Sequence, residues 1–513
     1  MKAPALQTPP RHPQLLLFTI FLLTAIEYLQ SGMIAFGSGP IMGEIGAAPE
    51  EFSLISATYA CVAIAAIAKQ RWFAERLGVR RFILLSLALF MVGAAVCASS
   101  STYLQFLAGR ICMAMGGGSL MTSARLLVNL FPPSPGRFNG IRYFASALAV
   151  SSASAPWLAS VAISHDGWRW IFLALIVVAA VALLLAAACL PAGVPARELR
   201  SQSHPVLLML LMAGSFGVLY ALQRSWYDFY GDATMLAAAG LVGVLALGYF
   251  VRAMHRHERV LLNLKALHNT RYWSGVALFT FCYILMAATN YTLPALLQRG
   301  LGFPWEAIGQ VQAVGLAGTV VSWLFLSILL PRKPAAKKYY LAGFLALAVF
   351  GWKMSQLSPA AGLWSDFVPA LACYGVFVML VLATTAMHTF REVSHHETVF
   401  SHAQQIKNML AQFGASVGIS LATINLQTRS AMHGEALRGH FAAGDPLYEQ
   451  ALHQLGAAYA QGGAANGEAL AAAGLAQLHA QQATLLASLD YFVIVAVVGV
   501  AGTLVMIGQR VLR

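Results

Sequence analysis

The fold is decided by the stretch Arg71-Trp72-Phe73-Ala74-Glu75-Arg76-Leu77-Gly78-Val79-Arg80-Arg81, a charged reversal between two apolar runs. These runs cover 52–73 and 81–100, about the twenty residues that an α-helix needs to cross roughly 30 Å of hydrocarbon. Glycine permits the reversal, and an acidic residue beside arginine can pair with it at a helix end. The stretch therefore predicts two transmembrane helices joined by a tight polar turn.

The same alternation of apolar runs and short polar joints extends over the whole chain. Hydrophobic residues make up 59% of the 513 residues and charged residues only 10%, too little charge to cover a soluble protein. A membrane β-barrel is excluded, because its strands are about ten residues long and alternate in polarity. We predict an all-α membrane protein with fourteen spans. The predicted spans are 15–37, 52–73, 81–100, 103–127, 139–163, 168–190, 206–223, 234–254, 272–296, 306–330, 338–356, 364–389, 402–425 and 488–510.

The distribution of Lys and Arg predicts the orientation. With the N-terminus, 1–14, in the cytoplasm, most of the 32 basic residues fall on the cytoplasmic side, as the positive-inside rule requires. The C-terminus is then cytoplasmic too. The exceptions are Arg169, Arg224, Arg299, Lys353, Arg429 and Arg438 outside, and Arg110 within a span. The net charge of +13 is scattered over the joints, which indicates contacts with membrane lipids and no nucleic-acid partner.

Residues typical of cofactor or catalytic sites are not grouped in the sequence. The six cysteines lack zinc-ligand spacing, so we expect no metal site and no disulfide. There is no phosphate-binding Gly-rich Lys motif and no His/Asp/Glu cluster inside a span. We therefore expect no cofactor, and an enzyme or a receptor is the least favoured class.

The long joint 426–487 is rich in Ala, Gln, His and Gly and is predicted to face the periplasm. Pro446–Ala460 and Gly467–Ala487 are expected to be helical, with breaks at Gly444-Asp445-Pro446 and Gly462-Gly463. Two alternatives stay open. The joint is either a poorly ordered loop, or a helical cap or docking surface for a periplasmic partner.

Two charges lie at membrane depth, where their cost makes them candidates for function. Glu27 is about twelve residues into the first span, roughly 18 Å from the cytoplasmic edge, and Arg110 roughly 11 Å from the outer edge. In a core of about 30 Å these levels nearly coincide, so the two could pair if spans one and four are neighbours. Burial and a guanidinium act oppositely on how firmly a carboxyl group holds a proton. We predict proton coupling through Glu27 and Arg110, a static ion pair being the alternative.

The stretch 71–81 resembles the loop between spans two and three of the major facilitator superfamily, whose pattern is Gly-x-Leu-Ala-Asp-Arg-x-Gly-Arg-Arg. Ala74, Arg76, Gly78, Arg80 and Arg81 fit this pattern, whereas Arg71, Phe73, Glu75 and Val79 depart from it. The resemblance implies a conformational gating role for Glu75, Arg76, Gly78, Arg80 and Arg81.

Other landmarks follow in the family's order. Ile26-Glu27 with Pro40 is similar to the first-span signature of the fourteen-span drug:proton antiporters, and Arg110 with Gly116-Gly117-Gly118 to their fourth-span motif. Gly167-Trp168-Arg169-Trp170-Ile171-Phe172 resembles the start of span six. The span-five stretch 151–160 has lost the family's glycines but keeps Pro156, a candidate hinge.

The whole series looks most like the EmrB-like branch of that family. The resemblance implies two six-helix halves, 15–190 and 272–510, with two extra helices and a cytoplasmic linker in 191–271. It also implies a periplasmic adaptor protein and an outer-membrane channel as partners. A central cavity between the halves is expected to bind a small amphipathic substrate. Its candidate lining residues are Tyr28, Gln30, Met33, Tyr283, Asn290, Tyr291, Gln312, Tyr374 and His388.

Two functions within this fold stay open. The first is proton-driven export of drugs, dyes, aromatic acids or fatty acids across the bacterial inner membrane. The second is uptake or facilitated transport of a single metabolite, which the lost span-five glycines favour.

Overall fold

The computed structural model describes most of the chain. The described residues are 12–132, 135–165, 167–193, 201, 204–224, 229–256, 262–332, 335–391, 393, 397–438, 445–461 and 466–511. Most of the predicted cytoplasmic N-terminus, 1–14, lies outside them, as do parts of the predicted linker 191–271 and the predicted breaks at Gly444 and Gly462-Gly463.

Every regular element of the described residues is a helix. In chain order these are α1 (Pro13–Phe36), α2 (Ser38–Ile45), α3 (Pro49–Leu77), α4 (Val79–Ala98), α5 (Tyr103–Gly117), α6 (Leu120–Leu127), η1 (Val128–Leu130), α7 (Pro135–His165), α8 (Arg169–Cys189), α9 (Pro205–Arg224), α10 (Phe229–Arg256), η3 (Lys265–Leu267), α11 (Thr270–Pro294), η4 (Ala295–Gly300), α12 (Trp305–Arg332), α13 (Ala336–Ser355), α14 (Phe367–Thr389), α15 (Glu397–Leu437), α16 (Pro446–Gln461) and α17 (Gly467–Gly508).

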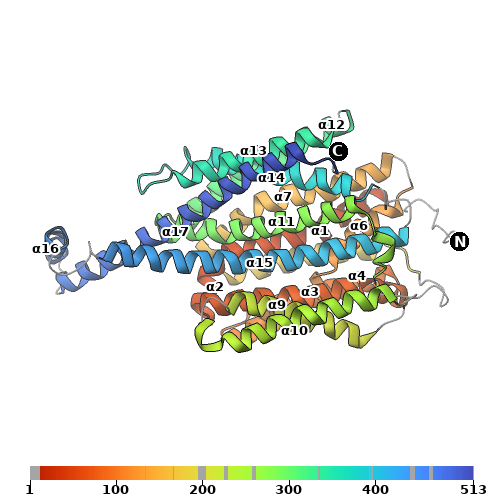
Figure 1. Cartoon of the computed structure of the whole chain (residues 1–513), viewed down its shortest axis with the longest axis horizontal. Coiled ribbons are helices and arrows are strands. Elements are labelled where there is room, and N and C mark those ends of the chain that lie inside the picture. Colours follow the sequence, from red (N-terminus) through yellow and green to blue (C-terminus); the bar gives the residue numbers. More distant parts are fainter. Residues whose placement is uncertain are drawn as a thin grey trace.

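The predicted all-α membrane architecture is confirmed. Thirteen helical segments of the described chain are long and apolar enough to cross a membrane. The eleventh predicted span corresponds to α13, which is not among them because Lys337, Lys338 and Lys353 lie near its ends. Nevertheless, α13 packs against α14 and α17 inside the bundle (Figure 1). It supplies the fourteenth helix.

The bundle is organised around two interfaces between its early and late helices. Helix α7 packs against α12, and α3 packs against α15, while α1 contacts α11 between them. Helices α9 and α10 pack on each other at the side, and α9 reaches α3 and α15. The central helices α1, α3, α11 and α15 are therefore the ones that can line a site between the halves.

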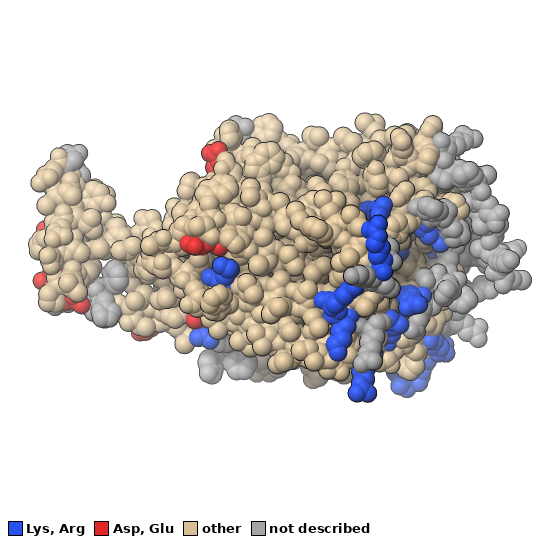
Figure 2. Space-filling model, turned by 90° about the horizontal axis from the view of Figure 1, so that it is seen from above, with Lys and Arg blue, Asp and Glu red and all other residues tan. Residues whose placement is uncertain are grey.

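The two ends of the bundle differ in shape and charge. Helices α15 and α17 extend beyond the other helices at one end, where α16 packs on α17 (Figure 1). Lys and Arg side chains gather at the opposite end, hereafter the basic end (Figure 2). Gly467–Ala487 was predicted to be helical, and it joins the last predicted span, 488–510, in one continuous helix, α17. Neither glycine nor proline interrupts this helix between Gly474 and Gly499.

Glycines set the closest helix contacts in the early half. A Cβ atom built on Gly93 of α4 would lie 2.7 Å from the carbonyl oxygen of Gly109 and 2.9 Å from the carbonyl carbon of Cys112, both in α5. Such distances leave no room for a side chain. The two backbones touch because neither helix presents a side chain at the crossing.

We predict that Gly93→Leu destabilises the protein by about 1–3 kcal/mol, because the added side chain forces α4 and α5 apart. The measurement is the apparent melting temperature of purified protein in detergent. Gly248→Leu is the matched control, since a Cβ atom at Gly248 of α10 meets nothing within 4 Å. Equal melting temperatures for the two variants would contradict the packing described here.

Candidate functional site

A small cavity lies between the two halves of the bundle. Its volume is about 90 Å³, room for roughly three water molecules at ~30 Å³ each. Residues of α1, α3, α5, α6, α11 and α15 contribute to its wall. The polar and aromatic lining residues are Glu27, Tyr28, Gln30, Ser31, Phe52, Ser56, Tyr59, Arg110, Tyr283, Tyr291, Asn408, Gln412 and Ser416.

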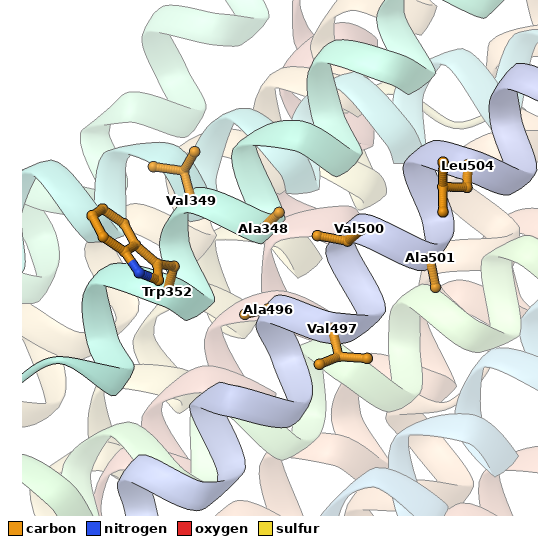
Figure 3. A pocket seen from close by; sticks show the side chains of 8 residues that line it. All are labelled: Ala348, Val349, Trp352, Ala496, Val497, Val500, Ala501 and Leu504. Atoms are coloured by element: carbon orange, nitrogen blue, oxygen red, sulfur yellow. The ribbon is translucent and has the colours of Figure 1, made fainter.

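A larger hollow, of about 630 Å³, lies between α13 and α17. Its lining side chains are alanine, valine and leucine together with Trp352 (Figure 3). Such a groove offers apolar contact but little that could orient a ligand. The polar central cavity is therefore the candidate functional site.

Both oxygens of the Glu27 carboxylate accept hydrogen bonds from side-chain amides. Gln30 donates through Nε2 to Oε2 at 3.2 Å, and Gln412 donates through Nε2 to Oε1 at 2.6 Å. Gln30 lies on the same helix as Glu27, whereas Gln412 lies on α15 in the other half. The carboxylate thus joins the two halves directly.

Arg110 reaches Glu27 through Gln30. Its Nη1 donates to Gln30 Oε1 at 3.4 Å, and its guanidinium lies over the Tyr59 ring, 4.1 Å from the centroid. The predicted direct pairing of Glu27 with Arg110 is wrong, since no ion pair joins these two residues in the described part of the chain. Gln30, one helical turn beyond Glu27, fills the space between them and also donates to Tyr59 Oη.

Four of the predicted substrate-cavity residues line this cavity: Tyr28, Gln30, Tyr283 and Tyr291. The hydroxyl groups of Tyr28 on α1 and Tyr283 on α11 are 2.9 Å apart, a second polar contact across the halves. Aromatic rings with a polar tip suit an amphipathic ligand, because they offer apolar area and a hydrogen bond together.

The other five lie elsewhere among the described residues: Met33, Asn290, Gln312, Tyr374 and His388. Tyr374 packs on Phe350 within the late half, with ring centroids 4.9 Å apart. His388 Nδ1 lies 3.1 Å from Nη2 of Arg271, near the end of α14. Each is on a span, but on a face that does not contribute to the cavity wall.

The charged turn makes several hydrogen bonds with Ser201. Glu75 accepts hydrogen bonds from Ser201 N at 2.6 Å, from Ser201 Oγ at 2.7 Å and from Arg71 Nε at 2.6 Å. Arg76 donates to Ser201 O at 3.3 Å and lies over the Trp72 ring. Gly78 ends α3 with φ +81°, a conformation that side chains disfavour.

The remaining arginines of the predicted gating motif differ in exposure. Arg80 is half-buried, and Arg81 is exposed at the start of α4. Arg71, which departs from the family pattern, makes the contact with the other half. Its Nη1 lies 2.8 Å from Nε2 of His402 on α15. The departure from the pattern therefore adds a polar link across the α3–α15 interface.

The α7–α12 and α3–α15 interfaces join the two halves on both sides of the cavity. At the basic end, Arg142 of α7 donates to Ser327 O of α12 at 3.4 Å. Towards the other end, Ser53 Oγ of α3 lies 3.2 Å from Ser420 Oγ of α15. The two halves are therefore in contact on both sides of the cavity.

Pro156 lies inside α7, close to the point where α12 crosses it. A Cβ atom on Gly309 of α12 would lie 3.0 Å from Pro156 O and would overlap the Ser160 side chain. On α1, a Cβ atom at Gly32 would lie 2.8 Å from Ala155 Cβ. The small residues that replace the family's glycines around Pro156 still permit close approach here.

Three residues important to this site were missed by the sequence reasoning: Tyr59, Gln412 and Lys407. Lys407 was assigned to a cytoplasmic helix end, but its side chain is only 4% exposed. A signal was present in the sequence, because Gln404, Gln405, Lys407, Asn408 and Gln412 form a polar series within an apolar span. Polar residues inside a span usually face the bundle interior.

Comparisons with known proteins agree with this geometry. The family model described as Major Facilitator Superfamily matches residues 20–419. An uncharacterised MFS-type transporter, YhcA of Bacillus subtilis (strain 168), is 22% identical over 448 residues, covering 86% of this chain and 82% of the relative. The putative multidrug resistance protein MdtD of Cronobacter sakazakii (strain ATCC BAA-894) is 25% identical over 389 residues, covering 74% and 79%.

Solved structures share the fold at low sequence identity. A structure described under substrate recognition in proton dependent oligopeptide transporters has a TM-score of 0.56 and 16% identity, covering 96% of this chain and 99% of that chain. A bacterial homolog of the human lysosomal transporter Spinster, inward-facing and unoccupied, has a TM-score of 0.54 and 14% identity, covering 98% of both chains.

Two helical halves that close over a polar cavity define a membrane transporter, in which the halves give access to the two sides in turn. The chain belongs to the Major Facilitator Superfamily. It is therefore a multi-pass transport protein. Membership of this family supports a transporter rather than an enzyme.

We predict that Arg71→Ala opens the cavity more often at the basic end, because α3 loses one of its polar contacts with α15 there. The measurement is alkylation of Met121→Cys, a cavity-lining position, in protein whose native cysteines are replaced. Losing a partly exposed charged hydrogen bond costs about 1 kcal/mol, so the rate should rise about threefold to tenfold. Arg252→Ala is the matched control, because Arg252 is exposed on α10 and lies outside the predicted gating motif. An equal rate in both variants would show that Arg71 does not hold the interface.

Proposed function

We propose that this chain is a proton-coupled exporter of small amphipathic or toxic compounds in a bacterial inner membrane. Relatives named putative multidrug resistance proteins support export. The observation on which the proposal depends is the Glu27 carboxylate, held between Gln30 of its own half and Gln412 of the other. The proton gradient is the energy source.

Protonation of Glu27 changes its hydrogen bonds with Gln30 and Gln412, because the carboxyl group gains an O–H donor. An ionised carboxylate only accepts hydrogen bonds, and here both oxygens receive an amide N–H. A protonated carboxyl group carries an O–H donor, which would face one of the two amide donors. One hydrogen bond then breaks, or its amide turns over. If the Gln412 contact breaks, the link between α1 and α15 weakens and the halves can separate.

The proposed orientation follows from the charge distribution. Basic side chains gather at the end opposite α16 (Figure 2), and the positive-inside rule places that end in the cytoplasm. The visible C-terminal end of α17 lies on the same side (Figure 1). Protons would then reach Glu27 from the α16 side, and substrate would reach the cavity from the basic end.

We expect Glu27→Gln to abolish transport driven by a pH gradient, because the amide cannot exchange a proton. The measurement is substrate movement in proteoliposomes with an imposed gradient, using a fluorescent dye as the transported probe. Dye binding in detergent should fall by less than about threefold, since Gln keeps the size of Glu.

Glu306→Gln is the control, because Glu306 is exposed at the start of α12. It should transport like the unaltered protein. Undiminished gradient-driven transport by Glu27→Gln would remove Glu27 from the coupling step.

We further propose that α15, α16 and α17 form a docking surface for a periplasmic adaptor protein, which connects to an outer-membrane channel. This would match the EmrB-like branch. Helix α16 exposes Leu447 by 74%, Tyr459 by 41% and Leu455 by 38%. It lies far beyond the other helices of the bundle (Figure 1), so lipid tails next to the bundle do not cover these side chains. Exposed apolar side chains of this kind favour a protein partner.

We expect the triple variant Leu447→Ser, Leu455→Ser, Tyr459→Ser to separate two activities. Transport in proteoliposomes should be unchanged, whereas drug resistance of cells should fall about tenfold or more. The matched control is Leu447→Met, Leu455→Met, Tyr459→Phe, which keeps the surface apolar. Equal resistance in both triple variants would contradict a docking role.

A further inference from the structure

A buried lysine, Lys407, lies beside the central cavity. Lys407 is on α15, and its Nζ lies 5.1 Å from the centroid of the Phe279 ring on α11. Its charge interacts with that of Glu27. However, no hydrogen bond or ion pair to its Nζ occurs among the residues that the structure describes. Burying an ammonium group without a hydrogen-bonded partner costs several kcal/mol, so a bound anion would stabilise the charged side chain.

A second cation lies close to the first. Arg125 on α6 interacts electrostatically with Lys407, and its guanidinium is 4.8 Å from the centroid of the Phe400 ring. Arg125 forms no ion pair within the described ranges. Two like charges in a partly buried site repel each other, and an anion between or beside them would offset this repulsion.

The position of Lys407 connects this pair of cations with the cavity. The next residue, Asn408, and Ala411, one helical turn on, both line the cavity wall. Helix α15 runs from the basic end towards α16, so Lys407 lies on the basic side of these lining residues (Figure 1). A ligand that reaches the cavity from the basic end would pass it.

Two polar atoms in the cavity wall also call for attention. Asn408 Oδ1 and Ser416 Oγ are buried in the cavity wall and lack a hydrogen-bond partner in the part of the chain described. Asn408 donates through Nδ2 to Thr122 Oγ1 at 2.5 Å, which fixes the amide in place. Unpaired polar atoms around a cavity indicate a polar ligand, because leaving them unpaired is costly.

We propose that Lys407, supported by Arg125, binds the carboxylate group of an anionic amphipathic substrate at the basic end of the central cavity. The proposal rests on the proposed export function and narrows its substrate class to organic acids. The apolar part of the substrate would lie against Phe279 and the tyrosines Tyr28 and Tyr283.

The test compares two probes that differ in one group, 2-naphthoate and the neutral 2-naphthylmethanol, by equilibrium dialysis against purified protein in uncharged detergent. We expect Lys407→Gln to raise the Kd for 2-naphthoate at least tenfold and the Kd for the alcohol less than twofold. An equal change for both probes, or no change for either, would overturn the proposal.

Three further variants keep the result interpretable. Lys407→Arg retains the charge and should keep the preference for 2-naphthoate, whereas Lys338→Gln removes an exposed lysine near the same end and should have no effect. If Lys407→Gln does not fold, Arg125→Gln takes its place, with an expected rise of about threefold for 2-naphthoate alone. An unchanged Kd in Arg125→Gln would then count against the site.

The same assay separates this proposal from the coupling mechanism. Glu27→Gln should lose gradient-driven transport and still bind 2-naphthoate in preference to the alcohol. A Glu27→Gln protein that transports normally would remove the coupling role and leave the carboxylate site intact. A Lys407→Gln protein that still prefers 2-naphthoate to the alcohol would remove the carboxylate site and leave the coupling role intact.

Discussion

The Glu27 carboxylate accepts one hydrogen bond from Gln30 in its own half of the molecule and another from Gln412 in the other half. An ionised carboxylate in a water-poor cavity needs such donors, because the loss of hydration costs several kcal/mol. Neutral amides donate these hydrogen bonds, but they stabilise the ionised form of the carboxylate less than a guanidinium would. The cohesion of the two halves therefore depends on the protonation state of one group, and the surrounding contacts of Tyr59 and Arg110 keep that group in position.

The two ends of the cavity are closed by different kinds of contact. At the basic end the closure is polar, between Arg71 and His402 and between Arg142 and Ser327. Towards α16 the hydroxyl contact of Ser53 with Ser420 is joined by the close packing of Gly309 on Ser160. Polar contacts near water exchange readily with solvent, whereas packing of this kind depends on shape alone. The two ends of the cavity therefore differ in how much polar contact and how much close packing hold the halves together.

The sequence allowed the fold to be predicted because span length and apolarity are local properties. The spans, the family and the reversal at Gly78 followed from residues close together in the chain. The helical stretch 467–487 and the last span were both predicted from local composition, but that they join into one helix, α17, was not.

The site was predicted only in part. Depth along a span placed Glu27 and Arg110 at one level, but could not reveal that Gln30 lies between them. Which side of a helix faces the cavity depends on packing between distant segments, and this is why Tyr283 lines the cavity while Tyr374 does not. Lys407 was misassigned because a lysine near a helix end normally extends towards water.

Helix α17 runs without interruption for 42 residues, from its contact with α16 to its packing against α13 in the late half. At about 1.5 Å per residue it is a rod roughly 60 Å long. A rigid rod of that length converts a tilt of about ten degrees at its base into a displacement of about 10 Å at its tip. Small rotations of the late half would therefore move α16 by a much larger distance. The position of α16 would report the conformation of the transporter.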